Sequence, residues 1–167
     1  CCNALQALGC SKGDRVALLA YNGHEFIESF FGPAKAGLVL MPLNWRLTAD
    51  ELSFILKDGG AQTIIFDADF APVVEKIRAM GDAGSDLRNW ICIGDSGPDF
   101  AVDYEGLLSD NSDAEPADKA GEEDNLFIMY TSGTTGHPKG VVHTHKTVFW
   151  ALLTLLNTAE THLSDKY

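Results

Sequence analysis

The stretch Tyr130-Thr131-Ser132-Gly133-Thr134-Thr135-Gly136-His137-Pro138-Lys139-Gly140 lies between two apolar runs, residues 126–129 and 141–142. Each run has the β-branched or aromatic content of a buried strand, and each is short enough to be one. The residues between them are rich in glycine and in hydroxyl side chains, which is typical of a loop. The pattern therefore predicts a loop that joins two buried strands.

The composition of this loop indicates phosphate binding. Positive φ angles, which glycine adopts readily, let consecutive backbone N–H groups converge on one anion, and they are expected at Gly133, Gly136 and Gly140. Hydroxyl donors for the same anion come from Thr131, Ser132, Thr134 and Thr135. Lys139 adds a mobile positive charge. A flexible surface loop without a ligand is the alternative, and this combination of residues disfavours it.

The spacing of the lysine excludes the most familiar phosphate loop. A Walker A sequence has Gly-x-x-x-x-Gly-Lys-Ser/Thr and opens a helix. Here Lys139 follows Gly136 by three residues and is followed by a glycine and a strand-like pair. A kinase-like or P-loop transferase is therefore disfavoured, although a phosphorylated product would revive it.

Residues 128–145 resemble the AMP-binding signature of the acyl-adenylate-forming superfamily, which comprises acyl-CoA synthetases, luciferases and the adenylation domains of peptide synthetases. Further stretches look like the amino-terminal half of an acyl-CoA synthetase in the same order: Gly13-Asp14-Arg15-Val16-Ala17, Asn22-Gly23-His24-Glu25-Phe26, Lys35-Ala36-Gly37, Pro42-Leu43-Asn44, Leu47-Thr48 and Glu51-Leu52. The resemblance is weakest at 94–124. Residues 140–146 look more like an acyl-CoA or fatty-acid synthetase than a peptide-synthetase domain.

The resemblance implies that the parent protein is a carboxylic acid:CoA ligase. It would use ATP, Mg²⁺ and coenzyme A to form acyl-AMP and pyrophosphate, then acyl-CoA. The implied nucleotide-binding residues are Thr131, Ser132, Gly133, Thr134, Thr135, Gly136 and Lys139. Lys139 would also act in catalysis by neutralising phosphate charge.

Other parts of the family pattern fall outside this sequence: the aromatic substrate-pocket motif, the Glu motif that binds adenine and Mg²⁺, the ribose-binding Asp, and the carboxy-terminal domain with its catalytic Lys. We therefore expect residues 1–167 to be an amino-terminal fragment of the AMP-binding domain that carries the phosphate loop and does not turn over alone. The alternative is a free-standing module that binds nucleotide or phosphate without chemistry.

The order of patterns along the chain predicts an α/β fold. Strand-like runs at 15–20, 38–41, 62–66 and 89–93 alternate with helical patterns at 24–36 and 70–80 and with a short helix that begins at the capping box of Thr48 and Glu51. This alternation predicts a parallel sheet with helices on both faces. By resemblance it would be part of the large amino-terminal domain of an adenylate-forming enzyme. Residues 144–157, apolar all round, predict a buried helix with Thr144 as its N-cap.

Charge and cysteine content narrow the choice of partners and compartment. The net charge is -12, and eleven of the 24 acidic residues lie at 94–124, where Lys119 is the sole basic residue. This segment, with a short helix at 102–108, is predicted to be an acidic surface loop, and nucleic acid is not expected as a partner. The four cysteines show no Cys-x-x-Cys pair, and no segment reads as a signal peptide or membrane span, which favours the cytoplasm.

Three histidines near the loop raise the question of a metal site. His143 and His145 are two residues apart and can share a strand face, with His137 nearby. No Cys or acidic residue is spaced to complete a zinc site. We therefore expect structural or capping roles for these histidines and no metal.

Overall fold

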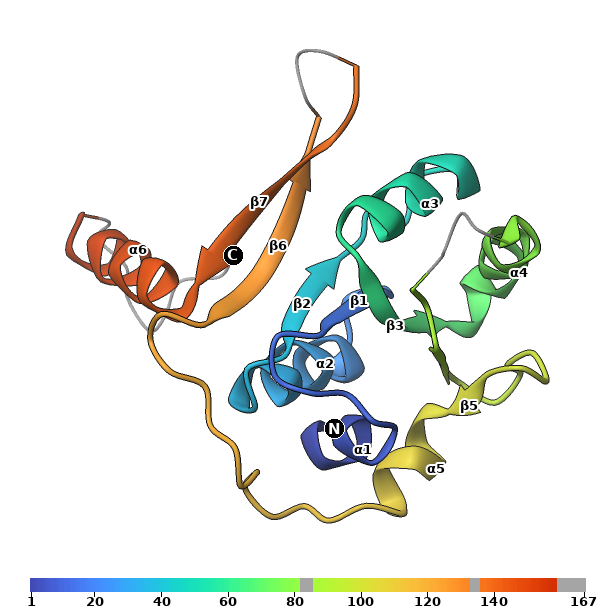
Figure 1. Cartoon of the computed structure of the whole chain (residues 1–167), viewed down its shortest axis with the longest axis horizontal. Helices are drawn as coiled ribbons and strands as arrows, with labels where there is room; N and C mark the ends of the chain where they lie inside the picture. The colour runs from blue at the N-terminus through green and yellow to red at the C-terminus, as the bar shows by residue number, and fades with distance from the viewer. Residues whose placement is uncertain (82–85, 133–135, 159–167) are drawn as a thin grey trace.

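The computed structural model describes residues 1–81, 86–132 and 136–158 (Figure 1). The helices are α1 (Cys2–Ala7), α2 (His24–Lys35), α3 (Ala49–Asp58), the 3-10 turn η1 (Ala68–Phe70), α4 (Ala71–Ala79), α5 (Tyr104–Ser109) and α6 (His145–Thr158). The strands are β1 (Arg15–Leu19), β2 (Val39–Pro42), β3 (Ala61–Asp67), β4 (Asn89–Ile93), β5 (Val102–Asp103), β6 (Asn125–Thr131) and β7 (Lys139–Thr144).

The strands form one sheet in the order β5-β4-β3-β1-β2-β6-β7. The pairs from β5 to β6 are parallel, and the last pair, β6 with β7, is antiparallel. The prediction of an α/β fold with a parallel sheet is confirmed, with β7 as an antiparallel edge. A hairpin can add an antiparallel edge strand through a short loop, whereas a parallel neighbour requires a long crossover.

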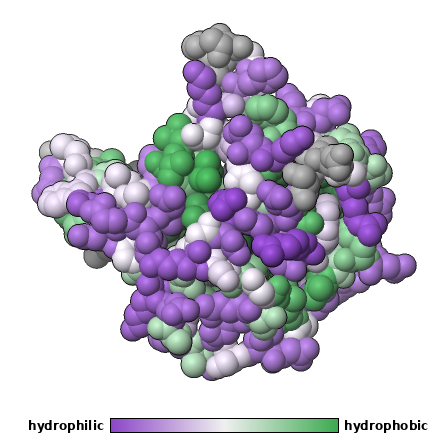
Figure 2. All heavy atoms as spheres, in the orientation of Figure 1, coloured by the Kyte–Doolittle hydropathy of each residue, from purple (hydrophilic) through white to green (hydrophobic). Residues whose placement is uncertain are grey.

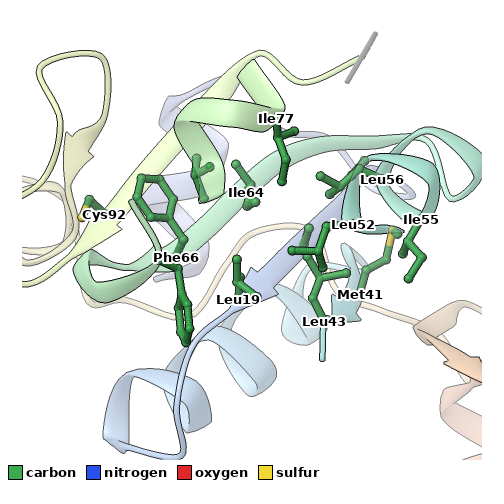
Figure 3. Packing of buried hydrophobic residues seen from close by; sticks show 14 residues of the cluster. Leu19, Met41, Leu43, Leu52, Ile55, Leu56, Ile64, Phe66, Ile77 and Cys92 are labelled. Atoms are coloured by element: carbon green, nitrogen blue, oxygen red, sulfur yellow. The ribbon is translucent and has the colours of Figure 1, made fainter. Parts of the chain in front are cut away.

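Helices cover both faces of the sheet, as predicted, and the alternation along β1 shows how the faces divide. Val16 and Leu18 pack in a cluster with α1, α2 and α5. Ala17 and Leu19 point the other way, into a cluster with α3 and α4. Figure 3 shows the second cluster, in which side chains of the helices meet those of the strands. The core thus lies in two layers on either side of β1 to β4.

The predicted burial of the two strands beside the glycine-rich loop is wrong for most of their length. In β6 only Leu126 is buried. In β7 no residue is buried: each is either exposed or half-buried, and Val142 is 51% exposed. The reason is position. Within the described residues, the two core clusters are built mainly on β1 to β4, so the faces of β7 lie open. Figure 2 shows a hydrophobic patch over this hairpin.

The helix predicted at 144–157 forms as α6, but its predicted burial is also wrong. The Thr144 hydroxyl accepts a hydrogen bond from the Thr147 backbone N–H at 3.1 Å, so the predicted N-cap is confirmed. No residue of α6 is buried, and Trp150 is 59% exposed. Apolar composition predicts that a helix needs to be buried, but burial also requires a surface to pack against. In the described chain α6 contacts mainly β7, so most of its apolar side chains stay exposed.

The acidic segment 94–124 runs from the end of β4 to the start of β6, on the other side of the sheet, past α1 and α2 (Figure 1). It includes α5, close to the predicted helix, and the two-residue strand β5, which is too short for a sequence pattern to reveal. The side chain of Asn3 donates to the backbone carbonyls of Ser112 and Ala114, and Lys35 pairs with Glu115 at 2.6 Å. The segment is therefore tied to the surface of the domain.

Candidate functional site

A cavity of about 810 Å³ lies where three neighbouring parallel strands, β1, β2 and β6, reach their carboxyl ends. The loops that follow these strands supply much of its wall, and α3 supplies another part. The lining residues most relevant to ligand binding are Asn22, Asn44, Trp45, Phe54, Thr131, Ser132, Gly136 and His137.

The topology explains why a cavity opens there. The chain leaves β1 for α2, which packs on one face of the sheet, and leaves the adjacent β2 for α3, which packs on the other. Two neighbouring strands whose following helices diverge to opposite faces leave a crevice at their carboxyl ends. Open α/β sheets bind ligands in such a crevice.

The fold brings part of the predicted phosphate loop to this cavity. Thr131, Ser132 and Gly136 line it, and Gly136 has a φ of 97°, the left-handed conformation predicted for it. Lys139 begins β7, is exposed, and forms no ion pair with any residue that the structure describes. The remaining predicted residues, Gly133, Thr134 and Thr135, lie outside the described residues.

The prediction of a positive φ at Gly140 is wrong, because this glycine lies within β7 and is absent from the positive-φ glycines of the described chain. Its role is close approach. A Cβ placed on Gly140 would lie 3.0 Å from Tyr130 Cζ and 3.0 Å from Ile128 Cγ2. Gly140 is the register partner of Tyr130 across the hairpin, so the missing side chain leaves room for the tyrosine ring.

Tyr130, directly before the loop, connects β6 to α3. Its hydroxyl donates to Asp58 Oδ2 at 2.6 Å. Partial burial raises the pKa of Tyr130, and the neighbouring Asp58 carboxylate, which accepts the hydrogen bond, raises this pKa further. The tyrosine therefore stays neutral and keeps the proton that it donates.

The histidines near the loop take separate places. His137 stacks on Phe54 of α3, with ring centroids 5.1 Å apart and an interplanar angle of 27°. His143 packs against Phe127 at 4.7 Å. His145 begins α6.

Among the described residues, one group of metal-ligand types does converge, and it contains none of the histidines near the loop: His24, Glu25 and Glu105. These side chains are exposed or half-buried and lie at the amino-terminal ends of α2 and α5. The partial positive charge of a helix amino terminus favours anions over a cation there.

Electrostatics at the α3 wall of the cavity are set by its capping box. Thr48 donates to Glu51 through its backbone N–H and through its hydroxyl, both at 2.8 Å. These hydrogen bonds lower the pKa of Glu51, and the bond from the Thr48 backbone has the larger effect. The carboxylate is thus already engaged by the turn that begins α3, as the sequence predicted for this pair.

Sequence reasoning missed the aromatic and amide part of the cavity wall, in particular Asn22, Asn44, Trp45 and Phe54. Three of them lie in the loops after β1 and β2, whose strands were predicted correctly. These residues could have been predicted from the order of the strands, because the loops at the carboxyl ends of adjacent parallel strands lie together at one edge of the sheet.

Residues 1–167 match the model of the family described as AMP-binding enzyme. The chain belongs to this family. The resemblance inferred from the loop and its flanking motifs is thereby confirmed.

Several relatives of this AMP-binding chain are similar over nearly its whole length. It is 49% identical over 99% of its residues to a long-chain-fatty-acid–CoA ligase, FadD13, from Mycobacterium tuberculosis. It is 34% identical over 98% of its residues to an indoleacetate–CoA ligase from Aromatoleum aromaticum. An inhibitor-bound N-terminal domain of FACL13 from Mycobacterium tuberculosis superposes with a TM-score of 0.87, at 47% identity over 99% of this chain and 39% of that one.

The chain spans 31% of the length of both of these ligases. It therefore matches about a third of proteins whose names describe acid–CoA ligation. Among the helices that the structure describes, none combines the length and the apolar character needed to cross a membrane.

Proposed function

We propose that this chain is part of an ATP-dependent acid–thiol ligase that activates a fatty acid as its acyl-adenylate and transfers the acyl group to coenzyme A. The observation that carries the proposal is that Thr131, Ser132 and Gly136 line the cavity at the crevice of the sheet, with Lys139 paired across the hairpin with Thr131. The 49% identical relative, named a long-chain-fatty-acid–CoA ligase, supports a fatty acid as substrate.

The reaction has two steps. First, a carboxylate oxygen of the acid attacks the α-phosphorus of ATP, the bond from this phosphorus to the oxygen that bridges to the β-phosphorus breaks, and pyrophosphate leaves with that bridging oxygen. Second, the thiol sulfur of coenzyme A attacks the acyl carbonyl carbon, its proton is lost, and AMP leaves. ATP enters as its Mg²⁺ complex, in which the ion offsets part of the phosphate charge.

The difficulty of the first step is charge, because an anion attacks a polyanion. Catalysis of such steps comes mainly from positioning and from fixed donors aimed at the phosphate oxygens. In the proposal, the hydroxyls of Thr131 and Ser132 and the backbone near Gly136 donate to the β- and γ-phosphates. Lys139 neutralises the charge that gathers on the leaving pyrophosphate. Gly133, Thr134 and Thr135 belong to the same proposed loop.

The compartment follows from the cysteines and the substrates. All four cysteines are free, and three of them, Cys2, Cys10 and Cys92, are buried. Free thiols persist in reducing compartments. We place the protein in the cytoplasm, where ATP and coenzyme A are available.

The test is fatty-acid-dependent exchange of labelled pyrophosphate into ATP, measured on the product of the longest reading frame that contains this chain. Exchange that requires both the acid and Mg²⁺ supports the ligase. Saturable binding of Mg·ATP without exchange for any acid would instead support a nucleotide-binding module. A second assay, release of AMP upon addition of coenzyme A, tests the thiol-transfer step separately.

A further inference from the structure

One face of α3 contacts both described flanks of the phosphate loop. Phe54 and Asp58 are four residues apart, so they lie one above the other on the same side of the helix. Asp58 accepts the hydrogen bond of Tyr130, at the start of the loop stretch, and Phe54 stacks on His137, near its end. A single helical face thus engages the loop stretch on both sides.

The contact at the entry side is specific in geometry. The Tyr130 hydroxyl and Asp58 Oδ2 are 2.6 Å apart, as expected for a hydrogen bond to a charged acceptor. The ring reaches α3 past the backbone of Gly140, at which a Cβ would contact Tyr130 Cζ. Glycine on one strand and tyrosine on the other therefore act together to aim the hydroxyl at the helix.

Further attachments of the hairpin lie away from the loop, at the middle and the start of β6. The register that joins β6 to β2 consists of the pair Leu40 and Phe127, near the middle of β6. Lys12 and Asp124 form an ion pair at 2.6 Å just before β6 begins. In the described chain, Asp58 and Phe54 add side-chain contacts to the loop-proximal half of the hairpin, where Ile128 and Tyr130 also pack against the core cluster.

The helix itself is a firm support. Its first turn is fixed by the reciprocal capping box of Thr48 and Glu51. Its inner face is anchored in the core by Leu52, Ile55 and Leu56, each at most 2% exposed. Figure 3 shows these three side chains reaching toward the sheet. A rigid element of this kind can hold functional groups to the tolerance that catalysis needs.

We propose that the face of α3 formed by Phe54 and Asp58 is a positioning surface for the phosphate loop. By holding Tyr130 and His137, it fixes where the Thr131 and Ser132 hydroxyls and the Lys139 amine meet the polyphosphate of ATP. Phe54 and Asp58 are positioning residues, since they act through Tyr130 and His137. The expected effect on ATP kinetics rests on the proposed function. The effect on the position of the loop rests on the two contacts alone.

The kinetic test uses the full-length product and removes one oxygen atom. Tyr130→Phe removes the hydrogen bond, and we expect the KM for Mg·ATP to rise about tenfold while the KM for the fatty acid stays the same. Asp58→Ala should have the same effect, the double variant should be no worse than either single one, and Asp58→Asn, which keeps an oxygen acceptor, should recover most of the affinity.

The matched control is Tyr104→Phe. Tyr104 is buried and donates to Glu28 Oε2 at 3.1 Å, so this variant also removes a tyrosine-to-carboxylate hydrogen bond, but on the α2 and α5 side of the sheet. It should lower thermal stability and leave the KM for Mg·ATP unchanged. An equal rise in KM in Tyr104→Phe, or no rise in Tyr130→Phe and Asp58→Ala, would overturn the inference.

Hydrogen exchange separates this inference from the proposed function. If the unsubstituted protein shows no acid-dependent pyrophosphate exchange, the ligase proposal fails, and the positioning role is then decided by amide exchange in peptides covering 125–132 and 136–144. Faster exchange there in Tyr130→Phe, with unchanged exchange in peptides of β1 to β4, supports it. Unchanged exchange contradicts it. Should Tyr130→Phe fail to fold, Phe54→Leu tests the contact with His137 by the same two measurements.

Discussion

Thr131 and Lys139 are partners in the antiparallel register of β6 and β7, the hydroxyl residue ending one strand opposite the lysine that begins the next. The pairing places a neutral donor and a cation on the two sides of the loop mouth, beside the cavity that Thr131 lines. A polyphosphate held there would meet both. The lysine's distance along the chain from Gly136 thus matters less than its position across the hairpin.

Lys139→Ala should lower acid-dependent pyrophosphate exchange about a hundredfold, because one fixed charge that stabilises the transition state is lost. Folding should be unaffected, since the side chain is exposed and pairs with no described acidic residue. Steady-state exchange rates and a thermal melt measure the two effects. Lys76→Ala, at an exposed site on α4, is the matched control and should change neither. Unchanged exchange in Lys139→Ala would refute the proposed role.

Gly140→Ala should destabilise the chain by about 1–3 kcal/mol, the usual cost of overpacking. The added Cβ would meet Tyr130 Cζ and Ile128 Cγ2 at 3.0 Å and push the tyrosine away from Asp58. Urea unfolding measures the loss. Gly121→Ala is the control, since its Cβ would meet Asp124 Oδ2 at an ordinary 3.5 Å. Equal stability of the two variants would mean that Gly140 has no packing role.

The sequence predicted the order of most elements because burial in β1 to β4 and the helices on them is local in origin. Apolar periodicity, the capping box at Thr48 and the N-cap at Thr144 each act within a few residues and were read correctly. The α/β class follows from that order. The loop could be recognised for the same reason, since its glycines and hydroxyls are contiguous.

Features that depend on distant partners were not predictable. The bond from Tyr130 to Asp58 joins residues 72 positions apart, and neither side chain carries a local signal. Gly140 was read as a flexible glycine, whereas its role depends on the ring across the hairpin. Val142 and Trp150 lie in apolar stretches of sequence that predicted burial, yet both are exposed. Apolar composition does not reveal which other element, if any, packs on a strand or helix.

The acid stability of the chain should depend on Asp124. The hydrogen bond from Lys12, followed by that from the Gly121 backbone, lowers the pKa of Asp124. A carboxyl whose pKa is lower in the folded state than in the unfolded state stabilises the fold above its unfolded pKa, near 3.9, and this contribution is lost as the pH falls through the folded pKa. Asp124→Asn should therefore lower stability at pH 7 and change it little at pH 2.

Unfolding midpoints of the chain and of Asp124→Asn, compared from pH 2 to pH 7, measure this dependence. Asp118→Asn is the matched control, because Asp118 lies in the same acidic segment and forms no ion pair with a described residue. A gap between Asp124→Asn and the unsubstituted chain that stayed constant across the pH range would show that the pair with Lys12 contributes nothing through ionisation.

The apolar face of α6 and β7 should make the 167-residue chain self-associate. Phe149 and Trp150 are 57% and 59% exposed, and exposed valines of β7 and leucines of α6 add to a surface that no described element covers. Exposed apolar surface of this extent promotes association. Sedimentation velocity should show oligomers that grow with protein concentration, and Phe149→Glu should reduce them. Phe31→Glu makes the same change at an equally exposed site on α2 and should reduce them less. A monomeric chain at all concentrations, or equal effects of the two substitutions, would show that this face does not drive association.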